Sequence, residues 1–385
     1  MLIWARETSG LTLDKAAERA GIKDAFGKTG AERLSVLEAG LDDPTRTQIM
    51  DLAKAYRRPL LTFYMGRPPV EGDRGEDFRT FSGPRPPDME GLLDALLRDV
   101  RTRHLVVQDV ISDEEDAAPV AFIGSVSPKS GADTVLKVLR RLIPIPLADL
   151  RRERTADAMF SRLRTAVEAL GVFVLLVGDL GNHLTSIDTA AFRGYAIADK
   201  IAPFIVINDK DTKAAWSFTL LHEMAHLIVG ASGVSGGTLA GSAVEQMCNQ
   251  VASSFLLSSN ELPEVAQQVQ GRPVVDALPL LIRFAEERKV SPDLVAYRLL
   301  RSDAITEATW NEMRGALRDR LEALRKARPD QKGGGGDFYN TRRHRLGGLV
   351  DFTRRALAQG SLTPSKAGLV LGVKPRMVQT LVGYG

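Results

Sequence analysis

A nearly continuous apolar segment that contains two histidines most constrains how this chain can fold. The segment SFTLLHEMAHLIVG spans residues 217–230, and its only titratable residues are His222, Glu223 and His226. A helix that is apolar on nearly all sides is buried in a protein core. Two histidines and a glutamate are costly to bury without a partner, and a cation is the simplest partner. The segment therefore predicts a buried helix at a metal site.

The spacing of the two histidines indicates what such a site could do. Residues four apart share one face of a helix, so His222 and His226 can both reach one ion. Glu223 would then lie beside the open position of the metal, where it can take a proton from water. The alternative interpretation is a coincidence, in which the two histidines are polar residues at the edge of a buried helix.

A third ligand separates these interpretations. Glu245 is a lone acid in a second apolar helix, SAVEQMCNQVASSFLLSSNELP, after a loop rich in glycine and serine. Two histidines and one glutamate leave a fourth zinc position for water, which is the catalytic arrangement. Asn249 shares the helix face of Glu245 and could orient a ligating histidine. Cys248 reads as a small core residue, and His183 is the first alternative third ligand.

Composition limits the compartment and the number of domains. A chain of 385 residues with 44% hydrophobic residues favours two or three globular domains. No apolar run reaches the roughly 18 residues of a membrane span, and no secretory signal is visible. The single cysteine, Cys248, excludes an internal disulfide framework. We therefore expect a cytoplasmic protein without a membrane partner.

The pattern along the chain predicts a mostly helical α+β protein. Short helices occupy residues 1–66, and a linker rich in proline and glycine spans residues 67–88. Residues 89–260 follow, with long amphipathic helices and strand-length apolar runs at 172–179, 191–197 and 202–209. A helical extension covers residues 261–332. A basic helical region at residues 333–385 begins with four glycines.

Charge is unevenly distributed between the two ends of the chain. Residues 1–66 carry ten Lys/Arg and nine Asp/Glu, whereas residues 325–385 carry twelve and three. A basic tail can follow a phosphate backbone, although a solvated basic surface is the commoner meaning. The stretch LTPSKAGLVLGV has Ala367, Leu371 and Gly372 at the spacing of a helix-turn-helix opening. The basic C-terminal region is therefore either a DNA-binding surface or a solvated basic surface.

The residues around the histidine pair resemble a known family, the ImmA/IrrE zinc metallopeptidases. The resemblance lies in HEMAH at 222–226 with its FTLLHE lead-in, the preceding strand APFIVIND, and Glu245-x-x-Cys-Asn followed by VASSFLL. It covers about residues 165–260 and extends loosely beyond them. It implies a zincin-like domain in which a thermolysin-like helix pair packs on a small sheet. It also implies His222, His226 and Glu245 as gluzincin-like zinc ligands and Glu223 as the catalytic base.

Residues 1–66 resemble the helix-turn-helix domain of XRE-type regulators. LTLDKAAERAGI corresponds to the first paired helices of that domain, and ERLSVLEAG and PTRTQIMDLAKAYRRPL to the rest. Two features depart from the pattern. The segment KDAFGKTG before the presumed reading helix is longer than usual. That helix also offers Ala31, Glu32 and Arg33 where side chains suited to base contacts are expected.

Two functions follow from these resemblances as expectations. The first is a zinc endopeptidase that cleaves a specific protein, a helix-turn-helix repressor of stress or mobile-element genes. The second is a transcriptional regulator or antitoxin, in which the N-terminal helices hold DNA or a partner such as a neighbouring toxin. In that case the peptidase domain senses or sequesters the partner and has little activity. We further expect residues 1–66 to bind duplex DNA poorly, because their charges nearly balance.

Overall fold

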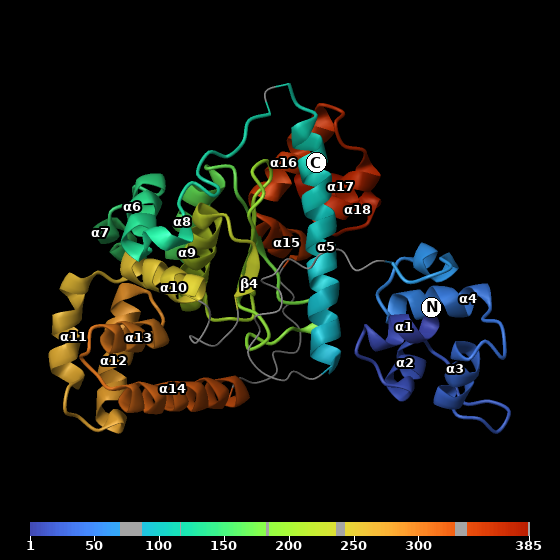
Figure 1. Cartoon of the computed structure of the whole chain (residues 1–385), viewed down its shortest axis with the longest axis horizontal. Helices are drawn as coiled ribbons and strands as arrows, with labels where there is room; N and C mark the ends of the chain where they lie inside the picture. The colour runs from blue at the N-terminus through green and yellow to red at the C-terminus, as the bar shows by residue number, and fades with distance from the viewer. Residues whose placement is uncertain (70–86, 116, 182–184, 236–242, 328–336, 384–385) are drawn as a thin grey trace.

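The computed structural model describes residues 1–69, 87–115, 117–181, 185–235, 243–327 and 337–383 (Figure 1). These residues form many helices around one small sheet, which confirms the expected mostly helical α+β class. Most of the predicted linker lies outside the described residues. None of the described helices is long and apolar enough to cross a lipid bilayer.

The N-terminal helices form a small body with its own core, drawn in blue in Figure 1. Thr12, Thr29 and Thr45 cap successive helices by accepting hydrogen bonds from backbone amides. The core consists of apolar side chains packed around Leu34, Leu52 and the fully buried Tyr56. The elements are α1 (Leu2–Glu7), α2 (Leu13–Arg19), α3 (Gly30–Glu38), α4 (Arg46–Ala55) and the 3-10 helix η1 (Leu60–Tyr64).

The sheet lies at the centre of the remaining chain and has the strand order β1-β3-β2-β4. β1 (Phe173–Leu176) runs parallel to β3 (Phe204–Ile207), and β2 (Gly194–Ile197) runs antiparallel to β3. β4 (Gly233–Ser235) pairs antiparallel with β2. The first three strands fall within the apolar runs that the sequence predicted as strands. The fourth follows the histidine helix and was not predicted.

The helices that carry the candidate site cover one side of the sheet. α9 (Lys213–Val229) packs against α10 (Ala243–Leu256), α8 (Ala156–Glu168) and α6 (Ala132–Leu142), all in one hydrophobic core. The short helices η2 (Pro128–Ser130) and α7 (Leu147–Arg151) flank this layer. Beyond it lie η4 (Ser259–Glu261), α11 (Leu262–Val269), α12 (Val274–Arg288), α13 (Pro292–Arg301) and α14 (Glu307–Ala327).

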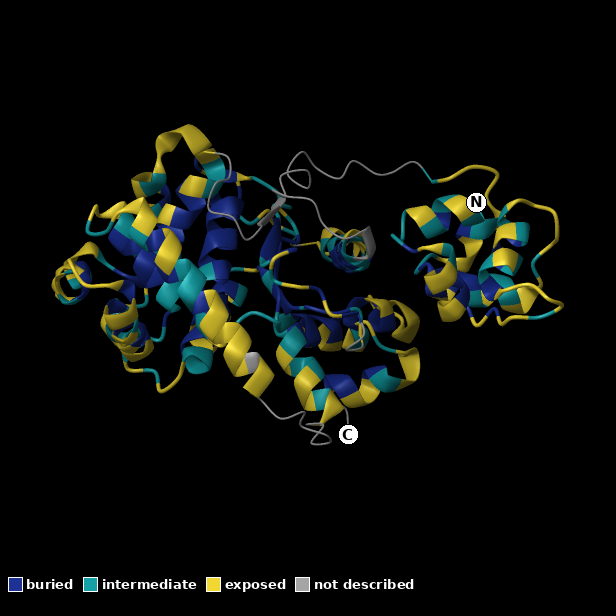
Figure 2. Ribbon diagram, turned by 90° about the horizontal axis from the view of Figure 1, so that it is seen from below, coloured by how far each residue is buried: buried dark blue, intermediate teal, exposed yellow. Residues whose placement is uncertain are grey.

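The opposite side of the sheet is covered by helices from distant parts of the sequence. The long helix α5 (Pro87–Ser112) and the C-terminal helices share a second core with strand residues such as Phe204 and Val206. Figure 2 shows the strands buried between these layers. The C-terminal elements are α15 (Phe338–Leu346), α16 (Gly348–Ala358), α17 (Pro364–Leu371) and α18 (Pro375–Val382). The sequence did not predict that the basic C-terminal region packs on the sheet.

Candidate metal centre

The histidine segment forms the buried helix that its apolar sequence predicts. Helix α9 is buried along nearly its whole length, and Gly230 ends it in a left-handed conformation at φ 72°. The side chains of His222, Glu223 and His226 are almost completely buried, with residue exposures of 3%, 0% and 4%. The first and last of these face the neighbouring helix α10 one turn apart. The predicted helix and its burial are therefore confirmed.

Helix α10 brings Glu245 to both histidines. The Oε1 atom of Glu245 lies 3.0 Å from His226 Nε2, and its Oε2 atom lies 3.3 Å from His222 Nε2. The two Nε2 atoms lie 3.1 Å from each other. The structure thus places the three predicted ligands around a common point, although Glu245 follows His226 by 19 residues and His222 by 23 residues. Among the described residues, this is the group of histidine, cysteine and acidic side chains that could hold a metal ion.

The donor set and its spacing fit a zinc ion. Two ligand atoms at about 2.0–2.1 Å from a tetrahedral zinc lie about 3.3 Å apart, close to the three distances observed here. Two imidazole Nε2 atoms that point at one another can share only one proton, so a cation explains their convergence better than a hydrogen bond does. Imidazole nitrogen and carboxylate oxygen are also the ligand atoms that zinc accepts.

The pKa values of Glu245 and His226 reflect the close approach of these side chains. Burial raises the pKa of Glu245, but hydrogen bonds from His222 and His226 lower it more, so its pKa lies well below the usual range. Burial lowers the pKa of His226, whereas contacts with Cys248 and Glu245 and the charge of Glu223 raise it well above the usual value overall. The ionised carboxylate of Glu245 is thus ready to bind a cation, whereas His226 must release its proton when a metal ion binds.

Glu223 projects from the same helix toward strand β2. A methyl group at Gly194 on β2 would lie 2.8 Å from Glu223 Oε1 and 2.5 Å from Thr219 Cγ2. Only a glycine at this strand position leaves room for the carboxylate. Gly194 was not among the residues predicted from the sequence, although a glycine inside a strand pattern signals a close approach of another group.

The remaining predicted residues have less direct evidence. Asn249 is buried on α10, but neither histidine Nδ1 atom has a hydrogen-bond partner within the described residues. Its role in orienting a histidine therefore stays a prediction. Cys248 is fully buried in the core, as expected, and contacts His226. His183 lies outside the described residues.

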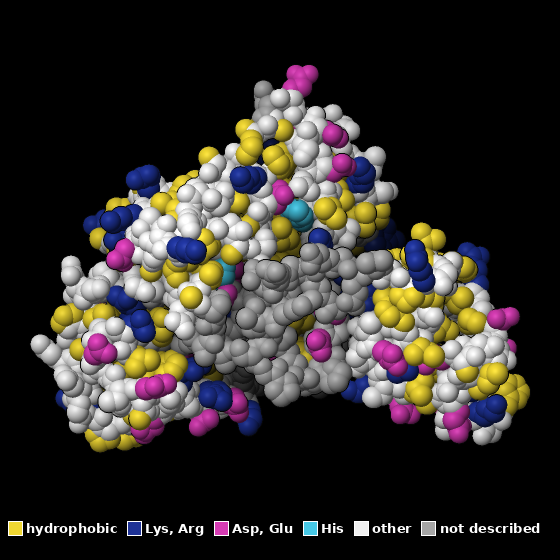
Figure 3. Space-filling model, viewed as in Figure 1, with side chains coloured by type: hydrophobic (Ala, Val, Ile, Leu, Met, Phe, Trp, Pro, Cys, Tyr) yellow, Lys and Arg dark blue, Asp and Glu magenta, His cyan; other side chains and the backbone are white. Residues whose placement is uncertain are grey.

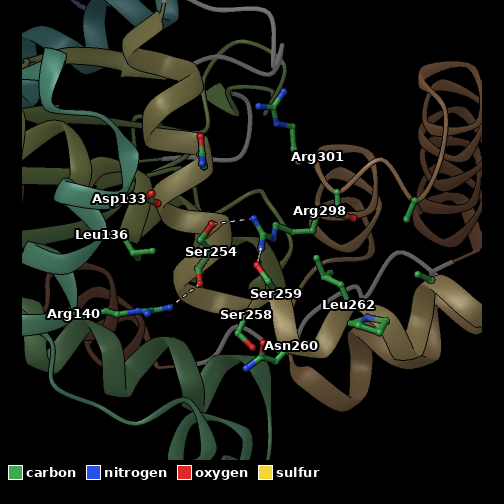
Figure 4. A pocket seen from close by; sticks show the side chains of 15 residues that line it. Asp133, Leu136, Arg140, Ser254, Ser258, Ser259, Asn260, Leu262, Arg298 and Arg301 are labelled. Atoms are coloured by element: carbon green, nitrogen blue, oxygen red, sulfur yellow. Dashed lines mark hydrogen bonds between the residues drawn. The ribbon is translucent and has the colours of Figure 1, made fainter.

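A separate pocket of about 740 Å³ lies on the other side of α10 (Figure 4). Arg298 of α13 donates hydrogen bonds to the hydroxyls of Ser254 and Ser259, at 2.9 and 3.2 Å. Arg140 of α6 donates to the carbonyl oxygen of Ser254 from the opposite side, at 3.3 Å. Ser254 lies about two and a half turns after Glu245, so it faces away from the histidines. These contacts connect α6 and α13 to the helix that carries Glu245.

Comparison with known proteins agrees with this site. Residues 177–300 match the family model described as the IrrE N-terminal-like domain, and this family consists of zinc metallopeptidases. The match contains α9 and α10 and therefore all the candidate site residues. It begins later than the predicted core at residue 165 and continues further, through most of α13. No curated protein and no solved structure matches the chain significantly.

The matched segment supports a metallopeptidase domain of the ImmA/IrrE type, as the sequence predicted. The N-terminal helices lie outside the match, so their similarity to XRE-type regulators stays a prediction.

Proposed function

We propose that this protein is a zinc-dependent endopeptidase of the ImmA/IrrE type that cleaves a specific protein. The observation that carries the proposal is the convergence of His222, His226 and Glu245 on one point, with Glu223 one residue from the first ligand. Three protein ligands leave a position for water, which distinguishes a catalytic zinc site from a structural one. This ligand set is the gluzincin arrangement, HExxH plus a downstream glutamate.

The side chains divide the reaction between them. His222, His226 and Glu245 would hold zinc, which when bound polarises a peptide carbonyl and lowers the pKa of water. Glu223 takes the proton from the attacking water and later gives it to the departing amine nitrogen. Gly194 leaves the space in which the Glu223 carboxylate lies. The apolar core around α9 strengthens these charge interactions by excluding water.

We propose a transcriptional repressor with a helix-turn-helix domain as the substrate. The support is the resemblance of residues 1–66 to XRE-type regulators, because domains of this type commonly pair with one another. In Figure 3, basic and acidic side chains are interspersed over the visible face of these helices, at the right of the view. Such a surface suits docking of a related protein better than nonspecific attraction to DNA.

A co-expression experiment tests the proposal. The full chain is expressed together with each small regulator encoded by a neighbouring gene, and truncation of the regulator is scored on a gel. We expect one regulator to be cleaved by the wild type, whereas Glu223→Gln binds zinc but does not cleave. Glu307→Gln is the matched control, because Glu307 is exposed at the start of α14, and it should cleave normally. Equal cleavage by Glu223→Gln would reject the proposed base.

The second candidate function is a regulator or antitoxin in which the peptidase domain is a sensor with little activity. The separate core of α1–α4 favours it, because that body has the packing of an independent binding module. In this case the full chain would bind DNA or a neighbouring toxin without cleaving any co-expressed protein. Zinc content would not separate the two functions, but the Glu223→Gln comparison would.

A further inference from the structure

The last two helices of the chain form a helix–turn–helix. Helices α17 and α18 have eight residues each and are separated by Gly372, Val373 and Lys374. Gly372 ends α17 in a left-handed conformation at φ 62°, which turns the chain sharply into α18. Two helices joined by a turn of three or four residues that contains glycine are typical of DNA-binding proteins.

The packing between the two helices also has the features of this motif. A methyl group at Gly368 would lie 2.8 Å from the carbonyl oxygen of Val373, so only glycine lets the turn approach α17 this closely. The Val373 amide donates a hydrogen bond of 2.9 Å to the Gly368 carbonyl. The apolar side chains between the helices are fully or almost fully buried, namely Ala367, Leu371, Val378 and Leu381. The angle between the helices is therefore fixed by close packing.

Two arginines of helix α15 bind the C-terminal ends of α17 and α18. Arg342 Nη2 donates to the carbonyl oxygen of Leu371 at 2.8 Å, and Arg343 Nε donates to that of Leu381 at 2.8 Å. These carbonyls belong to the last residues of α17 and to the last turn of α18, where helical partners are missing. The motif also shares its core with the sheet and α5. Figure 1 shows the C-terminal helices, in red, next to α5. The motif is thus held firmly to the domain that contains the candidate metal centre.

The outer side of α18 carries side chains suited to reading bases. Arg376, Gln379 and Thr380 are all exposed, and the last two follow Arg376 by three and four residues, so both neighbour it on one side of the helix. Lys374 is exposed at the N-cap. Arginine pairs with guanine and glutamine with adenine in the major groove. Within the described residues, Lys374 and Arg376 make no ion pair, so both charges are available to a ligand.

The surrounding charge favours nucleic acid. Residues 337–383 carry eight Lys/Arg and two Asp/Glu, a net charge of +6 from these residues, of which Arg345 is paired with Asp179 and Asp209 of other segments. Neutralisation of phosphates by such charges supplies most nonspecific affinity for DNA. The N-terminal α3 differs, because Arg33 donates to the carbonyl oxygen of Lys23 and Glu32 is held in the capping box with Thr29.

We propose that α17 and α18 bind duplex DNA, with α18 lying in the major groove and Arg376 and Gln379 contacting bases. In this geometry the N-terminal turn of the second helix reads base edges while the first helix crosses the backbone. Because the motif is packed on the core of the metal-binding domain, binding holds that domain at a particular DNA sequence. The inference does not depend on peptidase activity, so either can fail while the other stands.

The test uses the full-length protein and a duplex DNA library with a randomised central region. Repeated selection should enrich one sequence, which is then titrated in a fluorescence anisotropy assay. We expect Arg376→Ala and Gln379→Ala each to weaken binding to that sequence about tenfold and to relax the preference at one base pair. Arg355→Ala is the matched control, because it removes an exposed charge from neighbouring α16. It should weaken binding at most about threefold, equally for all sequences.

Three results would overturn the proposal. They are the absence of any enriched sequence, equal effects of Arg376→Ala and Arg355→Ala, and loss of the selected binding in Arg33→Ala rather than in Arg376→Ala. The last result would assign sequence reading to the N-terminal helices. The substituted C-terminal side chains are exposed, and thermal unfolding by circular dichroism confirms that each variant is folded.

Discussion

Gly194 on strand β2 lies directly against the carboxylate of Glu223 on helix α9. A methyl group added to Gly194 would come within 2.8 Å of Glu223 Oε1 and 2.5 Å of Thr219 Cγ2. Both obstructing groups belong to a helix that is buried on all sides, so neither can move away easily. The sheet therefore sets the position of the proposed catalytic base, although it supplies none of the metal ligands.

The first prediction follows from this contact. Gly194→Ala should displace the Glu223 carboxylate by a fraction of an ångström to an ångström and lower kcat about a hundredfold. Zinc content should stay at the wild-type value, because the three atoms nearest the added methyl group belong to Thr219, Glu223 and Val206 and none belongs to a proposed metal ligand. Gly315→Ala is the control, since a methyl group there meets nothing within 4 Å. An unchanged kcat in Gly194→Ala would contradict the assigned role of this contact.

The second prediction concerns the metal. The purified protein should contain about one zinc per chain, and His222→Ala or His226→Ala should abolish this content, because two remaining ligands hold zinc poorly. Elemental analysis of the dialysed wild type and variants measures the zinc content per chain. Full zinc content in both variants would place the metal elsewhere.

The third prediction concerns Glu245, whose substitution should weaken zinc binding without abolishing it. Glu245→Gln replaces a charged ligand by a neutral amide, and we expect zinc affinity to fall at least about tenfold in a competition with a chelator. Glu307→Gln, at an exposed position of α14, should leave the affinity unchanged. If the Glu245 variant binds zinc as tightly as the wild type, the third ligand is another residue, with His183 the first to examine.

The fourth prediction concerns the attachment of the C-terminal helices. Asp179 follows β1, its side chain is 7% exposed, and it pairs with Lys210 at 2.7 Å and with Arg345 of α15 at 3.2 Å. Asp209 lies 2.6 Å from Arg345 and 3.6 Å from Lys210 and keeps part of the charge compensation, so Asp179→Asn should lower the free energy of unfolding by about 1.5 kcal/mol. Asp351→Asn, at an exposed pair on α16, should change it by less than about 0.5 kcal/mol. Urea unfolding of both variants measures the difference.

The same carboxylate gives this effect a pH dependence. Burial raises the pKa of Asp179, but Lys210 and Arg345 lower it more, so its pKa in the folded state is below the usual value. A lowered pKa contributes stability above the unfolded pKa of about 3.9, and this contribution is lost as the pH falls through the folded pKa. The difference between wild type and Asp179→Asn should therefore be constant near neutral pH and shrink below about pH 4. A difference that grows on acidification would contradict the assignment.

Local sequence patterns were enough to predict the elements of the site. The apolar surroundings of His222 and His226 required a buried helix, and the four-residue spacing put both side chains on one face. Glu245 could be chosen because it is a lone acid in the next apolar helix. Both inferences depend on helical periodicity, which acts over a few residues and is therefore visible in the sequence.

Tertiary structure alone decided how distant segments meet. The contact of Gly194 with Glu223 joins a strand to a helix, and the hydrogen bond that Arg345 donates to Asp179 joins residues 166 positions apart. The C-terminal helices cover the sheet because its second side also needs an apolar layer, and periodicity within α15–α18 does not say which surface they cover. The sequence by itself determined the proposed metal ligands, because local periodicity was enough to choose them. The position of the base and the attachment of the helix–turn–helix depend on long-range packing, which no local pattern encodes.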